Sequence, residues 1–137
     1  MDDRKKVLII DDDRLVCNSV ANVARSLGFD SSLAFTLEEG LDAIRSAPFD
    51  VVFLDVRMPD GNGIDILPQV CRNSGSPEVI VITAYGDPES VESALSKGAW
   101  DYIEKPFSKA DLSQLLKDAI LYHESSTLPQ AALDFEK

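Results

Sequence analysis

The sequence predicts an α/β fold, a doubly wound, five-stranded parallel sheet with helices on both faces. Short β-branched apolar runs recur along the chain, and each is continuous rather than alternating, which suits strands buried on both faces. Segments with apolar residues at helical spacing lie between these runs. Strand and helix thus alternate five times in 137 residues, a length that suits one compact domain.

Five strands are expected in chain order. The clearest are the runs Val7–Ile10, Val51–Leu54 and Val79–Ile82, which are rich in valine and isoleucine. Ser31–Phe35 and Trp100–Ile103, the latter after a turn at Gly98, are weaker candidates.

The first two helices carry start or stop signals. Gly28 stands where a C-cap is expected, directly after an apolar stripe made of Val16, Val20, Val23, Ala24 and Leu27. The second helix opens with a capping box, in which Thr36 accepts from the backbone and Glu39 reaches back. Its buried side consists of Leu37, Leu41 and Ile44.

Three more helices complete the pattern. One is expected from about Ile64 to Arg72, and the next follows Pro88 and ends near Gly98. The last begins at Ser108, and its apolar stripe consists of Leu112, Leu115, Leu116, Ala119 and Ile120.

The apolar pattern decays after about Tyr122. Residues 1–122 are therefore expected to form the domain, and residues 123–137 a C-terminal tail or the start of a linker, because Glu124–Pro129 is polar and ends in proline. Ala131–Lys137 could form a short helix with little to bury.

Composition excludes several classes of protein. A net charge of -11, from 13 basic and 24 acidic residues, argues against a nucleic-acid surface. The apolar runs are far shorter than the roughly 20 residues of a membrane span, and Met1–Lys6 does not resemble a signal peptide, so a cytosolic location is expected. Cys17 and Cys71 lack the spacing of a zinc site or a disulfide framework.

Polar residues follow four of the predicted strands. Functional sites of open α/β sheets lie at the carboxyl ends of the strands. Asp11–Asp13 follows the first strand and Asp55 the third, the fourth ends at Thr83, and the fifth leads into Lys105. If the first strand lies between the second and the third, Asp55 and the first two acids of the run converge on one pocket.

Asp11, Asp12 and Asp55 would raise one another's pKa and cost stability unless they shared a cation. Mg²⁺ prefers oxygen ligands and commonly uses one or two carboxylates with phosphate oxygens. Thr83 adds a hydroxyl and Lys105 an ammonium, and both suit phosphoryl oxygens. These residues describe a phosphoryl site in which Asp55 could be the nucleophile and form an aspartyl phosphate.

Each residue alone has a simpler interpretation. Asp12 or Asp13 could cap a helix, Asp55 could be a turn acid, and Thr83 and Lys105 could be an ordinary strand-end residue and a solvated charge. Four separate strand ends that each supply a residue needed for phosphoryl transfer favour the site over these alternatives.

The residues that follow the strands belong to four longer motifs, whose order and spacing are informative. They are Val7–Asp13, Phe53–Gly63, Ile82–Gly86 and Gly98–Phe107, within a region from about Lys5 to Tyr122. As a set they resemble the response-regulator receiver domain of two-component signalling, in the CheY-like superfamily. The resemblance implies a flavodoxin-like strand order 2-1-3-4-5.

The resemblance also implies roles for individual residues in phosphorylation and metal binding. Asp55 matches the phosphoacceptor, which takes a phosphoryl group from the phosphohistidine of a sensor histidine kinase or a phosphotransfer protein. Asp11 and Asp12 match the acids that hold Mg²⁺, with Asp55 and the backbone carbonyl of Arg57 as further ligands. The domain would catalyse only its own phosphorylation and dephosphorylation.

Three further matches describe a switch. Thr83 matches the hydroxyl that moves toward the phosphoryl group, and Tyr102 the aromatic ring that rotates with it. Lys105 matches the lysine that pairs with the phosphoryl oxygens, ahead of Pro106, which resembles the family's cis proline. These changes are expected to reach the surface of the fourth helix, fifth strand and fifth helix, where they would control dimerisation or partner binding. The possible contact residues there are Leu95, Trp100, Tyr102 and Ile103, with a core role left open for Trp100 and Ile103.

The domain or process that such a receiver would control is less clearly indicated by the sequence. Ile82–Gly86 and Gly98–Phe107 are most similar to receivers of sigma-54-dependent, NtrC-type transcriptional activators, which implies that an ATPase and a DNA-binding domain would follow. The alternative is a stand-alone receiver that acts by protein–protein interaction or as a phosphorelay intermediate.

Two other functions fit the residues poorly. A haloacid-dehalogenase-type phosphatase usually needs a second aspartate two residues after the nucleophile, where this chain has Arg57. A flavodoxin-like binding module would need serine, threonine or glycine after the first strand, where three acids stand and would repel a phosphate.

Overall fold

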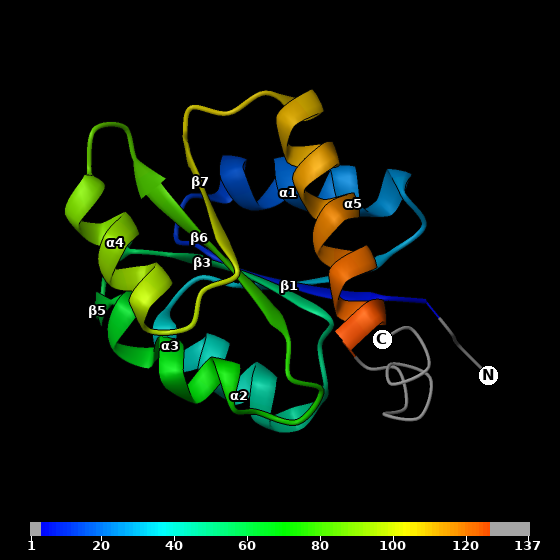
Figure 1. Ribbon diagram of the computed structural model, residues 1–137, viewed down its shortest axis with the longest axis horizontal. Helices are drawn as coiled ribbons and strands as arrows, with labels where there is room; N and C mark the ends of the chain where they lie inside the picture. Colours follow the sequence, from blue (N-terminus) through cyan, green and yellow to red (C-terminus); the bar gives the residue numbers. More distant parts are fainter. Residues whose placement is uncertain (1–3, 127–137) are drawn as a thin grey trace, which may run out of the picture.

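The computed structural model describes residues 4–126 and contains a five-stranded parallel sheet with the strand order β2-β1-β3-β6-β7 (Figure 1). Counted over this sheet, that is the predicted order 2-1-3-4-5, and the predicted fold class is confirmed. Each expected strand is present, and no end differs from the prediction by more than two residues. The strands are β1 (Lys6–Ile10), β2 (Asp30–Ala34), β3 (Val51–Asp55), β6 (Glu78–Ala84) and β7 (Asp101–Lys105).

Helices cover both faces of the sheet. Figure 1 shows α1 (Arg14–Ser26) and α5 (Lys109–Ser126) together on one face. The other face carries α2 (Leu37–Ser46), α3 (Gly63–Cys71) and α4 (Pro88–Ser96). The five predicted helices are thus confirmed.

The continuous apolar runs are explained by burial on both sides. Along β1, Leu8 and Ile10 pack into the apolar cluster beneath α2, α3 and α4, whereas Val7 and Ile9 pack into the cluster beneath α1 and α5. Because successive side chains of a strand point to opposite faces, each residue of the run needs to be apolar. The two clusters together stabilise the central strands and fix their carboxyl ends in place.

Side-chain caps set where the helices begin. Asp13 caps α1 by accepting hydrogen bonds from the backbone N–H groups of Leu15 (2.9 Å) and Val16 (3.4 Å). Thr36 Oγ1 accepts from the N–H of Glu39 at 3.1 Å, as the predicted capping box requires. The Glu39 carboxylate reaches back one residue further than expected and accepts from the N–H of Phe35 at 3.0 Å.

A short hairpin that the sequence analysis did not predict follows β3. Its strands are β4 (Arg57–Met58) and β5 (Gly61–Asn62), which pair antiparallel around the turn Pro59–Asp60. Strands of two residues are too short to show a periodic pattern.

The last helix runs past Tyr122, where the apolar pattern decays, to Ser126. His123 explains the extension, because its ring is buried between two carboxylates. Nε2 lies 3.2 Å from Oδ1 of Asp50, and Nδ1 lies 3.3 Å from Oε1 of Glu78. Residues 123–126 of the predicted tail are therefore helical, whereas the predicted short helix at Ala131–Lys137 lies outside the described residues.

None of the helices among residues 4–126 is long and apolar enough to cross a membrane. Cys17 is buried, Cys71 is half-buried, and both are free thiols. Burial raises the pKa of Cys17 to about 12 and also raises the pKa of Cys71.

Candidate functional site

The carboxyl ends of β1 and β3 bring three acids together. Asp11 directly follows β1, and Asp55 is the last residue of β3, with Ile10 and Leu54 paired one position earlier. Asp11, Asp12 and Asp55 each offer a carboxylate oxygen, and these oxygens lie within 4.8 Å of one another. The structure thus shows the convergence expected from the strand order. Asp11 and Asp55 are buried, while Asp12 is exposed.

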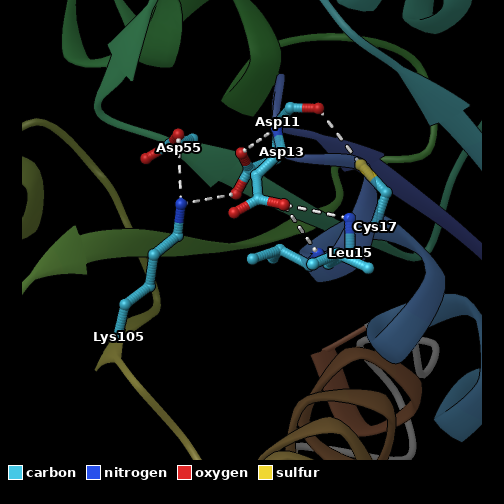
Figure 2. Close-up of polar contacts among 7 residues, drawn as sticks. Asp11, Asp13, Leu15, Cys17, Asp55 and Lys105 are labelled. Carbon is cyan, nitrogen blue, oxygen red and sulfur yellow. Dashed lines mark hydrogen bonds and ion pairs between the residues drawn. The ribbon is translucent and has the colours of Figure 1, made fainter.

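Backbone and side-chain contacts hold Asp11 in place (Figure 2). Its Oδ1 accepts a hydrogen bond from the N–H of Asp13 at 2.9 Å, and its carbonyl oxygen accepts one from the Cys17 thiol at 3.1 Å. The side chain of Asp13 is used for capping α1, so for Asp13 the simpler helix-cap interpretation is correct. Asp12 and Asp13, although adjacent, therefore have different surroundings.

Lys105 bridges the two buried acids. Its Nζ lies 3.1 Å from Oδ2 of Asp11 and 3.5 Å from Oδ2 of Asp55, and Figure 2 shows the side chain extended from the end of β7 toward both. Burial opposes the charge of Lys105, but the hydrogen bonds and charges of the two carboxylates outweigh it and raise the pKa of the ammonium. The peptide bond from Lys105 to Pro106 is cis, as the resemblance implies.

The Asp55 carboxylate has an unusual affinity for a proton. Burial, and then the neighbouring charge of Asp11, raise the pKa of Asp55 to about 7. Lys105 and a backbone hydrogen bond from Arg57 act in the opposite direction and lower it. Without a metal ion, the Lys105 ammonium is therefore not enough to return the pKa of Asp55 to its ordinary value.

The remaining predicted residues lie on β6 and β7. Thr83 is buried, and its hydroxyl has no hydrogen-bond partner within the described part of the chain. Tyr102 is half-buried and lines a groove between α4 and β7 together with Leu95 and Glu104. Because Thr83 pairs with Glu104 and Ala84 with Lys105, the ends of these two strands lie at the same edge of the sheet.

The predicted contact residues of the surface formed by α4, β7 and α5 divide into two groups. Leu95 is 45% exposed, and Tyr102 borders the groove. Ile103 is buried in the core beneath α1 and α5, where Trp100 also packs, with its ring centroid 5.8 Å from that of Tyr122. The core role left open for Ile103 is thus correct, and Trp100 is half-buried against the same core.

The donor set fits Mg²⁺. Three carboxylates lie together and the ammonium of Lys105 contacts two of them, so the cluster has more acidic groups than basic ones. Oδ2 of Asp11 is buried and, apart from its ion pair with Lys105, has no hydrogen-bond partner. All three acids offer hard oxygen ligands, and the exposed Asp12 leaves one side of the cluster open to solvent. The Arg57 carbonyl remains a predicted further ligand.

Sequence reasoning missed Asp60 as a structural residue near the site. Its carboxylate accepts hydrogen bonds from the N–H groups of Leu37 (2.9 Å) and Glu38 (3.1 Å), at the start of α2. The run Pro59-Asp60-Gly61 is a turn signal that could have revealed the β4–β5 turn. Its partners lie 22 and 23 residues away, so no local pattern predicts them.

The raised pKa of Asp55 has a consequence for stability. Because the folded, metal-free protein holds this proton from the ordinary pKa of 3.8 up to about 7, its free energy of unfolding is expected to fall as the pH rises through that range. Urea denaturation with a chelator present, at about pH 5 and about pH 8, measures the loss. Asp55→Asn lacks this contribution, so an equally steep decline in that variant would contradict the assignment.

Known proteins share the sequence pattern and the fold of this chain. The family model for the response regulator receiver domain matches residues 7–117. The chain is 32% identical to the transcriptional regulatory protein ZraR of Escherichia coli over 90% of its length and 28% of that protein. It is 36% identical to the DNA-binding response regulator MtrA of Mycobacterium tuberculosis, over 80% of the chain and 47% of that protein. The chain thus spans less than half the length of these relatives.

Solved structures have the same fold. The CheY-like receiver domain protein of Methanospirillum hungatei superimposes with a TM-score of 0.84 at 28% identity, over 90% of this chain and 98% of that one. NtrX of Brucella abortus, solved in complex with ADP, gives a TM-score of 0.84 at 26% identity, over 90% of this chain and 28% of that one.

Proposed function

This chain belongs to the family of response regulator receiver domains, and we propose that it accepts a phosphoryl group on Asp55 from the phosphohistidine of a sensor histidine kinase or a phosphotransfer protein. The proposal rests chiefly on one observation: the buried Asp55 carboxylate shares a cluster with Asp11, Asp12 and the Lys105 ammonium. It describes a signalling domain that modifies itself rather than an enzyme that turns over a separate substrate.

The transfer is a displacement at phosphorus. A carboxylate oxygen of Asp55 forms the new P–O bond as the P–N bond to the donor imidazole breaks, and the imidazole keeps the bonding electron pair and takes up a proton. Asp11, Asp12, Asp55 and the Arg57 carbonyl would hold Mg²⁺, which neutralises charge on the phosphoryl oxygens when it is bound. Lys105, already 3.5 Å from Asp55, would pair with a phosphoryl oxygen.

Thr83 and Tyr102 would carry the signal outward. The unpartnered, buried hydroxyl of Thr83 gains a strong acceptor when phosphoryl oxygens arrive at Asp55, so a position closer to the phosphoryl group becomes favoured. Thr83 pairs with Glu104 on β7, and Tyr102 lies two positions earlier on the same strand. The Tyr102 ring would fill the space beside α4 that the movement of Thr83 opens.

The direct test is phosphorylation by a small phosphodonor. Incubation with acetyl phosphate and Mg²⁺ is expected to add one phosphoryl mass to the intact protein, and omission of Mg²⁺ is expected to prevent it. Absence of the added mass under both conditions would contradict the proposal.

We further expect phosphorylation to alter the surface formed by α4, β7 and α5 and to drive dimerisation. Sedimentation with beryllofluoride and Mg²⁺ should show an approximately twofold larger mass than without them, because the aspartyl-phosphate mimic favours the switched surface. Leu95→Arg is expected to keep the protein monomeric. Leu33→Arg is the matched control, since Leu33 is 38% exposed on β2 at the other edge of the sheet. An unchanged mass for the wild type would contradict dimerisation.

The output proposed here is transcription regulation, through an ATPase and a DNA-binding domain in the manner of NtrC-type activators. ZraR and MtrA, which are named as regulators of transcription or DNA-binding proteins, support it. A stand-alone receiver or phosphorelay intermediate is the alternative. Residues 1–122 as the receiver unit, 123–137 as tail or linker, and a cytoplasmic location stay predictions.

A further inference from the structure

The β4–β5 hairpin is attached to the sheet at its base. The N–H of Gly63 donates to the carbonyl oxygen of Val56 at 2.7 Å, and the N–H of Val56 donates to the carbonyl oxygen of Ile82 at 3.2 Å. The backbone of Arg57, the first residue of β4, hydrogen-bonds to Asp55. The position of this hairpin therefore bears directly on the phosphoacceptor.

Asp60 attaches the tip of the same hairpin to a different part of the fold. Its Oδ1 and Oδ2 accept from the N–H groups of Leu37 (2.9 Å) and Glu38 (3.1 Å), two of the backbone donors that an isolated helix leaves free. The hydrogen bond from Leu37, and to a lesser extent that from Glu38, lowers the pKa of Asp60. Thr36 Oγ1 accepts from the next backbone donor, the N–H of Glu39. The side chains of Asp60 and Thr36 together therefore cap the start of α2.

Helix α2 is itself fixed against the strand that leads to Asp11. A Cβ built on Gly40 would come within 2.5 Å of Cδ1 of Ile10, so the helix backbone lies directly on the last residue of β1. Leu37 and Ile44 are buried in the same apolar cluster as Ile10. Asp60 thus ties the segment after Asp55 to a helix that is seated beside Asp11.

We propose that Asp60 is a positioning residue for the metal site, because it holds the β4–β5 hairpin, and with it the backbone of Arg57, in place relative to Asp11 and Asp55. The inference rests on the proposed function, since Arg57 supplies the proposed carbonyl ligand. Asp60 does not belong to the acid cluster, whose members are Asp11, Asp12 and Asp55. It acts on the site through the hairpin.

Asp60→Ala is expected to weaken Mg²⁺ binding about tenfold, the size of effect typical of residues that orient metal ligands. Asp65→Ala is the matched control. It removes the same charge from an exposed position on α3 that makes no side-chain hydrogen bond within residues 4–126. Titration calorimetry with Mg²⁺ alone, on the unphosphorylated protein, measures both. Asp60→Asn keeps one acceptor oxygen and is expected to fall between the wild type and Asp60→Ala.

Two further readouts separate positioning from a general loss of structure. Amide hydrogen exchange at Leu37 and Glu38 is expected to quicken in Asp60→Ala while exchange along β1 and β3 stays slow. The Mg²⁺ concentration that half-saturates phosphorylation by acetyl phosphate is expected to rise about tenfold, with the maximal rate at saturating Mg²⁺ within about twofold of the wild type.

Equal Mg²⁺ affinities in Asp60→Ala and Asp65→Ala would overturn the inference. So would Asp60→Asn with wild-type affinity, which serves as the decisive comparison if Asp60→Ala fails to fold. A wild-type protein that binds Mg²⁺ but takes up no phosphoryl group would contradict the proposed function alone, because the affinity comparison does not depend on phosphorylation.

Discussion

Asp55→Asn is expected to abolish phosphorylation by acetyl phosphate, with no added phosphoryl mass under conditions that modify the wild type. An asparagine amide has nearly the same shape as the carboxylate but lacks an anionic oxygen that can attack phosphorus. The substitution also removes one of the three carboxylates of the cluster and the partner of Lys105 at 3.5 Å. Loss of the nucleophile is therefore joined by weaker binding of Mg²⁺.

Intact-protein mass spectrometry measures this result, and peptide mapping locates the modification. Asp65→Asn is the control, because it makes the same chemical change at an exposed position on α3 outside the cluster and should label like the wild type. Labelling of Asp55→Asn to the same extent as the wild type would place the phosphoacceptor elsewhere.

Gly63→Ala is expected to give the largest loss of stability, about 3 kcal/mol in the free energy of unfolding. A Cβ at Gly63 would overlap the backbone carbonyl oxygen of Asp55 and would lie 3.2 Å from Cγ of Leu54. Backbone atoms in a buried, hydrogen-bonded strand cannot rotate out of the way as a side chain can. Either the helix start or the end of β3 must move, so the Asp55 carboxylate is displaced as well.

Gly40→Ala provides the matched comparison. Its Cβ would also come too close to a neighbour, Cδ1 (2.5 Å) and Cγ1 (2.9 Å) of Ile10, but these are side-chain atoms, which can shift more readily than the backbone of a paired strand. Alanine inside α2 recovers about 1 kcal/mol of helix propensity, which offsets part of the cost. Urea denaturation of both variants should show a clearly smaller loss for Gly40→Ala. Equal losses would contradict the role assigned to the Asp55 carbonyl.

The strands and the acid cluster could be predicted because each leaves a local signal. A strand buried on both faces needs apolar residues throughout, as in Val7–Ile10, and the carboxyl ends of parallel strands share one edge, which brings Asp11 and Asp55 together. Asp60 and His123 left no such signal. Their partners are 22 to 73 residues away in sequence, and a single acid in a turn or a single histidine on a helix has many ordinary explanations.

The end of α5 extended beyond the prediction for a related reason. Its last turn is stabilised by tertiary contacts of His123 rather than by an apolar stripe, and the ring finds both carboxylates only once β3 and β6 are paired. The β4–β5 hairpin was missed because two-residue strands carry no period and because its closing contact, from Asp60 to α2, is long-range.

The His123 contacts also bear on which parts of the domain can shift. Asp50 directly precedes β3 and Asp55 is its last residue, so they lie about 16 Å apart at roughly 3.3 Å per residue. Glu78 and Thr83 are separated by the same number of residues along β6. His123 thus fixes the last turn of α5 to the start of the same two strands whose other ends lie at Asp55 and Thr83. Helix α4 has no comparable brace, since Ala94 is its one buried residue. Rearrangement that begins at Asp55 should therefore be taken up by α4, while the end of α5 keeps its distance from the site.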